Sequence, residues 1–150
     1  QFLSDVFWDD LDFLVVDMPP GTGDISISMA QFLPRAQVLV VTTPQPTAQR
    51  VARRAALMAQ HVDQELIGVV ENMSWFTGDD GKRYELFGSG WGAALAEEMG
   101  VPRRVRPLPD LRPVAVAAPD SEASQAFERL AIAVEEARPR VRTHPDLIIR

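Results

Sequence analysis

The stretch LDFLVVDMPPGTGD, residues 11–24, decides the fold class of this chain. Its first six residues are almost continuously apolar, as in a strand covered on both faces of a parallel sheet. Asp17 follows directly, and the Pro-Pro-Gly sequence after it ends the strand with a turn. The stretch therefore predicts a buried strand over residues 11–16 with a carboxylate at its C-terminal end.

Strands and helices continue to alternate after this stretch. Short apolar runs predict two more buried strands, at 36–43 and 65–71. Apolar residues at helical spacing predict helices over 24–32, 47–62, 89–99 and 123–137. The apolar face of the second helix is predicted to comprise Val51, Ala55, Met58 and Val62. This alternation is typical of an α/β fold with a doubly wound, mostly parallel sheet.

The remaining segments carry weaker patterns. The turn sequence GDDG, residues 78–81, predicts a small hairpin within 76–87. Residues 101–116 are rich in Pro and Arg and have little strand character. We expect residues 1–137 to form one domain and residues 138–150 to be a loosely ordered tail.

Composition excludes several classes of protein. The net charge of -6 argues against a nucleic-acid partner, and no apolar run approaches the length of a membrane span. The absence of cysteine excludes disulfides and thiolate metal ligands within the chain. We therefore expect a cytoplasmic protein without membrane contact. No signal peptide pattern is visible. Because the chain lacks an initiator Met and its first clear element is a strand ending near Asp17, we also expect the natural protein to begin upstream.

Asp17 and Gly21 are the first candidate site residues. An acid at the C-terminal end of a parallel strand occupies the Walker B position of nucleotide hydrolases, where it binds Mg²⁺ directly or through water. Gly21 has no Cβ, so a main-chain N–H can approach a phosphate closely. The alternative is a plain Pro-Gly turn followed by a helix that Asp24 caps.

Two further strings stand at predicted strand ends. Thr43 and Gln45 belong to TTPQ, residues 42–45, whose polar groups suit a water or a phosphate oxygen. Asn72 belongs to ENMS, residues 71–74, and its amide can both donate to and accept from the edge of an adenine. Taken alone, each string is more often an ordinary strand end or turn.

These strings, in this order, closely resemble the Mrp/ApbC group of iron–sulfur carrier ATPases, relatives of MinD and ParA. The resemblance includes FGSG, residues 87–90, and PDS, residues 119–121, and extends from about Asp12 to Ala137. It implies a partial MinD-like P-loop fold that forms a homodimer around ATP and Mg²⁺. It also implies a protein that carries an iron–sulfur cluster to apo-protein clients under the control of ATP hydrolysis.

The resemblance also assigns roles to individual residues. Asp17 would be the Walker B acid and magnesium ligand, and Asp17 and Gly21 would form the catalytic set. Pro20 and Gly21 would contact the nucleotide, with Gly21 toward the γ-phosphate. Thr43 and Gln45 would lie near the nucleotide or the dimer face, and Asn72 would contact adenine.

Three departures from the family pattern qualify these roles. No string fits the phosphate-binding loop, since Gly81-Lys82 is followed by Arg83 within a predicted hairpin turn. The stretch 75–86 lacks the Cys-x-x-Cys pair of many members, and residues 106–110 match poorly. We therefore expect the C-terminal part of an ATPase, inactive by itself. A MinD/ParA-like partner-binding switch and a non-hydrolysing interaction module remain the alternatives.

Overall fold

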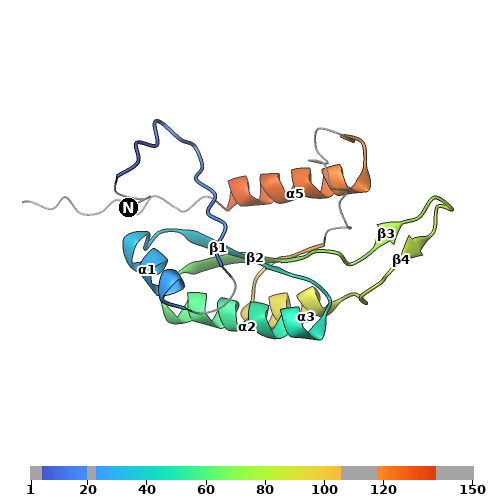
Figure 1. Ribbon diagram of the computed structural model, residues 1–150, viewed down its shortest axis with the longest axis horizontal. Coiled ribbons are helices and arrows are strands. Elements are labelled where there is room, and N and C mark those ends of the chain that lie inside the picture. The colour runs from blue at the N-terminus through green and yellow to red at the C-terminus, as the bar shows by residue number, and fades with distance from the viewer. Residues whose placement is uncertain (1–4, 20–22, 106–117, 138–150) are drawn as a thin grey trace, which may run out of the picture.

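A three-stranded parallel sheet forms the centre of the computed structural model, which describes residues 5–19, 23–105 and 118–137 (Figure 1). Its strands are β1 (Gln37–Thr42), β2 (Glu65–Glu71) and β5 (Arg103–Val105), in the order β1-β2-β5. β1 and β2 pair from Gln37 opposite Glu65 to Thr42 opposite Glu71. The strands predicted at 36–43 and 65–71 are thus confirmed, as is the parallel α/β class.

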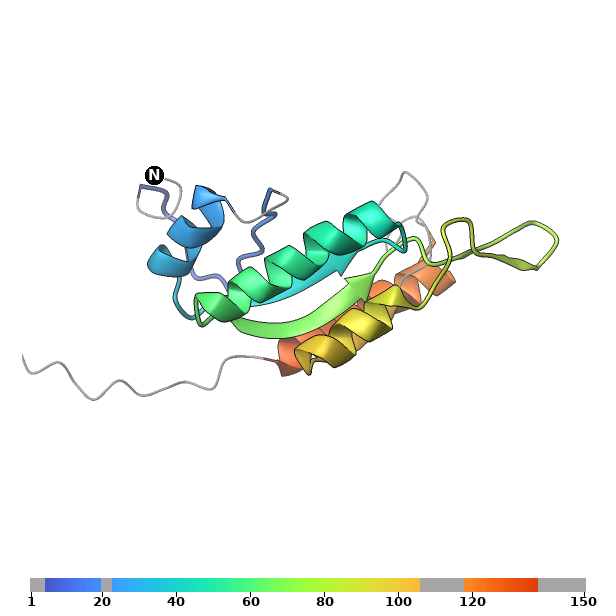
Figure 2. The ribbon, with the colours of Figure 1, turned by 90° about the horizontal axis from the view of Figure 1, so that it is seen from below.

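Helices cover both faces of the sheet (Figures 1 and 2). α2 (Pro46–His61) and α3 (Trp91–Met99) lie on one face, and α5 (Glu122–Glu136) lies on the other. α1 (Asp24–Phe32) lies near the start of β1. All four predicted helices are present, and α2, α3 and α5 begin at the edge where β1 and β2 end.

Local chemistry explains where these helices begin and end. Pro46 is the first residue of α2, where its fixed φ suits a helix and its missing N–H leaves no bond unmade. Gly100 ends α3 in the left-handed conformation, at φ 67°. At α5 the Ser121 hydroxyl accepts a hydrogen bond from the Ser124 N–H at 3.2 Å and so caps the helix.

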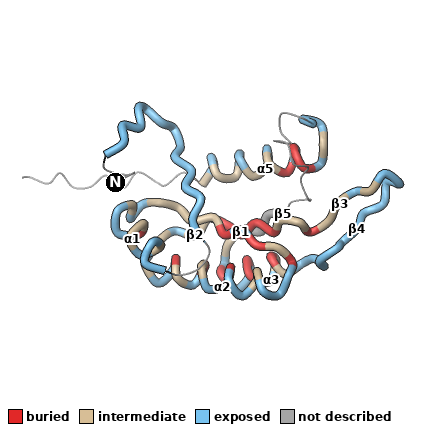
Figure 3. Tube along the Cα trace, in the orientation of Figure 1, coloured by how far each residue is buried: buried red, intermediate tan, exposed pale blue. Residues whose placement is uncertain are grey.

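The core lies between the sheet and the α2/α3 layer (Figure 3). It is built around Val40 of β1, Val69 of β2 and Leu95 of α3. The predicted apolar face of α2 is wrong by about one residue, because its buried residues are Ala52, Ala56 and Ala59. Val51 is 42% exposed. Small alanine side chains let α2 approach the sheet closely, and a count of the larger apolar residues misses that contact.

The strand predicted over residues 11–16 is not formed. The segment has no regular secondary structure and belongs to neither sheet, and its residues are exposed, Val15 to 88%. It lies on the β1 side of the sheet, beside α1 (Figures 1 and 2). A parallel strand is stabilised by pairing with a neighbouring strand along at least one edge, and this segment pairs with none of the described strands.

The weaker predictions have mixed outcomes. The hairpin is confirmed, with β3 (Phe76–Thr77) antiparallel to β4 (Arg83–Tyr84), and it projects beyond the carboxyl edge of the sheet. Part of the segment 101–116 forms β5, parallel to β2. Residues 106–117 and the predicted tail 138–150 lie outside the described residues. Among the helices of the described part of the chain, none combines the length and apolarity needed to cross a membrane.

Replacing Leu95 with Ala tests this account of the core. Leu95 is 1% exposed, so we expect the Leu95→Ala variant to lose about 3 kcal/mol of unfolding free energy through lost burial and a cavity. Ile132→Ala in α5 is the control, since Ile132 is 49% exposed and should cost less than about 1 kcal/mol. Urea unfolding measures both, and equal losses would contradict the placement of the core.

Candidate functional site

The carboxyl ends of β1 and β2 are joined directly. The Asn72 N–H donates to the Thr42 carbonyl oxygen at 2.7 Å, one residue beyond the strand pairing. The structure therefore brings two predicted site residues, Thr43 and Asn72, to one edge of the sheet. Both side chains are half-buried. Ligands of open parallel sheets bind at this kind of edge.

Thr43 has an unsatisfied hydroxyl. Its Oγ1 atom is buried and finds no hydrogen-bond partner among the described residues. A buried polar atom without a partner costs about 1–3 kcal/mol, so such atoms are uncommon outside binding sites and water sites. Thr43 stands between the end of β1 and the N-terminus of α2, where a polar group of a ligand can satisfy it.

Asn72 is held in a tight local turn. Its Oδ1 accepts a hydrogen bond from the Met73 N–H at 3.0 Å, and Met73 adopts a positive φ of 60°. This bond fixes the side chain and directs the amide NH₂ group away from it. The side chain therefore retains a hydrogen-bond donor for a ligand at the sheet edge.

Gln45 lies at the start of α2. It is the N-cap residue, is exposed, and its carbonyl oxygen accepts from the Gln49 N–H at 3.1 Å. Pro44 is buried beside it, and its carbonyl oxygen accepts from the Gln49 side chain. Gln45 thus belongs to the same edge as Thr43, with its side chain toward solvent.

Asp17 is not at the end of a paired strand. It is exposed and follows the segment 11–16, which lies outside the sheet. The prediction that a buried strand holds Asp17 at the carboxyl edge is therefore wrong for this structure, for the reason given for that segment. Pro20 and Gly21 lie outside the described residues.

Sequence analysis missed Glu71, whose side chain is fully buried at the end of β2. Its Oε1 accepts from the Ser74 hydroxyl at 2.8 Å and from the Gly90 N–H at 3.0 Å. Its Oε2 accepts from the Gly92 N–H. A Glu at a strand end ordinarily faces solvent. Ser74 lies close to Glu71 in sequence, but the Gly90 of FGSG lies 19 residues away, so sequence proximity does not indicate the contact.

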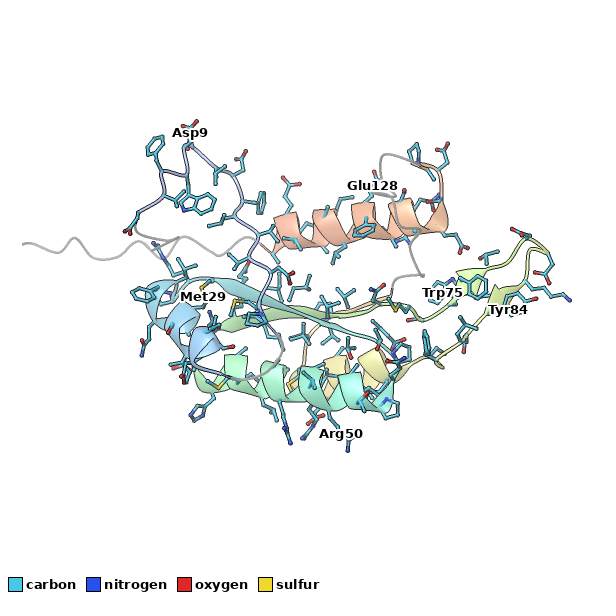
Figure 4. The ribbon with its side chains drawn as sticks, in the orientation of Figure 1. Asp9, Met29, Arg50, Trp75, Tyr84 and Glu128 are labelled. Carbon is cyan, nitrogen blue, oxygen red and sulfur yellow. The ribbon has the colours of Figure 1, made fainter. Side chains whose placement is uncertain are left out.

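The hairpin carries an aromatic cluster and no thiolate. The rings of Phe76 and Tyr84 stack with centroids 5.3 Å apart, and the Arg83 guanidinium lies 4.3 Å from the centre of the Trp75 ring (Figure 4). The sequence GDDG forms its turn, so Gly81-Lys82 is confirmed as a hairpin turn and not a phosphate-binding loop. The described residues contain no group of His, Cys, Asp and Glu suited to a metal ion.

Glu122 of α5 fastens this hairpin to the domain. Its Oε2 accepts from the Thr77 hydroxyl at 3.1 Å and from the Trp75 indole N–H at 3.4 Å. Its Oε1 lies 3.7 Å from the Arg83 guanidinium. The hairpin is therefore tied to the first turn of the helix that covers the other face of the sheet.

The chain belongs to the family of the NUBPL iron-transfer P-loop NTPases, whose model matches residues 1–135. It is 56% identical over 99 residues to the iron–sulfur cluster carrier protein of Mycobacterium leprae, covering 66% of this chain and 26% of that protein. It is 40% identical over 141 residues to the protein of the same name in Haemophilus influenzae, covering 87% of this chain and 38% of that one. The resemblance to the Mrp/ApbC group is confirmed.

A solved structure supports the same fold. It is a nucleotide-binding protein from Archaeoglobus fulgidus in complex with ADP, with a TM-score of 0.55 and 28% sequence identity. The match covers 91% of this chain and 52% of that one. This chain thus spans about half of that structure and between a quarter and two-fifths of the carrier proteins named above.

The hairpin yields a prediction about pH. The Tyr84 hydroxyl donates to Asp80 Oδ2 at 2.7 Å, and the Lys82 N–H donates to Oδ1 at 3.0 Å. The bond from Tyr84, and then that from Lys82, lowers the pKa of Asp80. Tyr84→Phe should therefore raise the pKa of Asp80 toward its ordinary value, as measured by NMR titration of the carboxyl group.

The sign of the stability effect follows from this lowered pKa. The contribution of the Asp80–Tyr84 bond is present above about pH 4 and is lost as pH falls through the lower pKa of folded Asp80. Phe76→Leu is the control, because it disrupts the ring stack and leaves the Tyr84 hydroxyl in place. An unchanged Asp80 pKa in Tyr84→Phe would show that the hydroxyl does not hold it.

Proposed function

We propose that this chain is part of an ATP-binding and ATP-hydrolysing iron–sulfur cluster carrier of the Mrp/ApbC type. The observation that carries the proposal is the buried Thr43 hydroxyl, which finds no hydrogen-bond partner among the described residues, at the joined ends of β1 and β2. In a chain of the iron-transfer P-loop NTPase family, a nucleotide is the ligand that best explains this atom.

The proposed roles follow the polar groups of this edge. Thr43 donates to a phosphate oxygen or to the water beside it, and Asn72 uses its NH₂ group at the adenine edge. Gln45, at the exposed start of α2, borders the nucleotide or a second copy of the chain. Asp17 is the magnesium ligand, and Pro20 and Gly21 supply main-chain contacts to the phosphates. Bound Mg²⁺ supplies positive charge that offsets the phosphate charge.

The N-terminus of α2 favours an anion at this edge. α2 begins where β1 ends, and it has no acidic residue in its first turn. The N-terminus of a helix carries partial positive charge and unpaired N–H groups, which stabilise phosphates. The edge therefore combines a favourable potential with a buried hydroxyl that has no partner within the described part of the chain.

The iron–sulfur cluster is the proposed cargo, and this chain lacks the usual ligands for it. The chain contains no cysteine, and iron–sulfur clusters are held mainly by thiolates. The thiolate ligands therefore have to come from outside these 150 residues. We propose that a homodimer formed through the nucleotide face holds the cluster and passes it to apo-protein clients in the cytoplasm.

A non-hydrolysing interaction module is the second candidate. It is favoured by the projecting hairpin, where Leu86 is 62% and Phe87 41% exposed, and by the position of Asp17 outside the sheet. A MinD/ParA-like switch that binds a partner is a separate alternative. Iron content after anaerobic reconstitution and ATP turnover, both measured on the complete protein, separate these candidates from the carrier.

Thr43→Val tests the nucleotide site, because it should leave the stability of the ligand-free protein unchanged or higher and lower its affinity for ATP. Valine removes the unsatisfied hydroxyl at almost constant volume, so we expect the ligand-free protein to be as stable or about 1 kcal/mol more stable. The same change should weaken ATP binding about tenfold in the complete protein, because valine has no hydroxyl to donate a hydrogen bond to the nucleotide. Thr47→Val, on the exposed surface of α2, is the matched control.

Calorimetric titration with ATP and urea unfolding measure the two effects. A Thr43→Val protein that loses stability and keeps its ATP affinity would assign the hydroxyl to the fold and not to a ligand.

Asp17→Ala tests the proposed magnesium role. Asp17 is exposed, so its removal should leave the unfolding free energy within about 0.5 kcal/mol of the wild-type value. ATP hydrolysis in the complete protein should fall at least about a hundredfold, because the carboxylate that orients Mg²⁺ is gone. Asp12→Ala, in the same exposed segment, should retain turnover. Unchanged turnover in Asp17→Ala would remove Asp17 from the site.

A further inference from the structure

Glu71 is the only carboxylate among the buried residues of the described part of the chain. Burial of an ionised carboxylate is costly unless hydrogen bonds replace its hydration. Here the hydroxyl of Ser74, itself fully buried, and two main-chain N–H groups of the α3 start supply those bonds. The arrangement is therefore specific to a carboxylate, and a neutral amide cannot reproduce it because its NH₂ group would face N–H donors.

The α3 side of the contact is fitted to Glu71. A Cβ at Gly92 would stand 2.7 Å from the Cβ of Glu71 and 3.0 Å from its Oε2. Gly90 adopts a φ of 93°, which residues with a side chain rarely adopt. Both glycines are therefore required for the carboxylate to reach the helix.

Glu71 also replaces a missing helix cap. Gly90 is the N-cap residue of α3 and has no side chain to accept a hydrogen bond, so two of the first N–H groups bond to Glu71. This contact fixes the end of β2 to the start of α3. Asn72 follows Glu71 immediately, and its N–H is already bonded to β1 through the Thr42 carbonyl.

We propose that Glu71 is the positioning residue of the nucleotide site, holding Asn72 against the base by fastening the end of β2 to the first turn of α3. The inference rests on the proposed function, because it assumes that Asn72 reads adenine. Glu71 does not touch the nucleotide. Its effect reaches the ligand through the backbone that it shares with Asn72, so its loss should affect the base and spare the phosphates.

Glu71→Gln in the complete protein is the test, with Glu85→Gln as the matched control. Glu85 lies in the loop before FGSG and is exposed. Its carboxylate accepts a hydrogen bond from the Ser89 hydroxyl at 2.8 Å. The measurements are the affinities for ATP, GTP and inorganic tripolyphosphate with Mg²⁺. Amide hydrogen exchange at Asn72, Gly90 and Gly92 is measured on the same proteins.

The expected result is selective. Glu71→Gln should reduce the preference for ATP over GTP about tenfold, the loss of one well-formed hydrogen bond, while tripolyphosphate affinity changes less than about threefold. Exchange at all three amides should accelerate by more than the change in global stability accounts for. Ser74→Ala removes one bond to the carboxylate and should act in the same direction, more weakly. It serves as the test if Glu71→Gln does not fold.

Two results would overturn the inference. One is an unchanged preference for ATP over GTP in Glu71→Gln and Ser74→Ala. The other is a parallel loss of ATP, GTP and tripolyphosphate affinity, which would make Glu71 a structural residue only. If the wild-type protein binds no nucleotide, the proposed function fails by itself. Exchange at Asn72 that follows global unfolding alone would then reject the positioning role separately.

Discussion

The parallel pairing of β1 with β2 is the interaction on which the rest of the structure depends. It places Thr42 opposite Glu71 and lets the Asn72 N–H bond to the Thr42 carbonyl, so both strands end at one edge. The helices that follow these strands then begin at that edge, since each connection returns across the sheet. The strand ends, the unsatisfied Thr43 hydroxyl and two helix N-termini are gathered by this one register.

Most of the fold follows from local sequence patterns, and the predictions that were wrong share one cause. β1 and β2 are short apolar runs between turn residues, and α5 has a Ser121 cap and helical periodicity, so each is specified by its own sequence. Residues 11–16 carry an equally good strand pattern, but strand formation also requires a neighbouring strand, which the local sequence does not specify. On α2 the buried face depends on how closely the helix approaches the sheet, which small alanines decide.

The candidate site could be predicted from the sequence only in part, for the same reason. Thr43 and Asn72 could be predicted because parallel strands end together, so polar residues after each strand meet in space. Glu71 could not, because its burial depends on Gly90 and Gly92, which are distant in sequence and approach it only after α3 packs on the sheet. A glutamate with no visible partner in sequence is ordinarily read as exposed.

The proposed role of Asp17 requires a further strand in the same sheet. A carboxylate that orients Mg²⁺ has to be held by rigid backbone, and Asp17 follows an exposed segment that pairs with no described strand. β1 pairs with β2 along one edge, and the described residues leave its other edge unpaired. The apolar segment 11–16 lies on that side. A magnesium site at Asp17 therefore requires this segment to enter the sheet on the β1 side, which would bury its apolar side chains and bring Asp17 to the edge that holds Thr43.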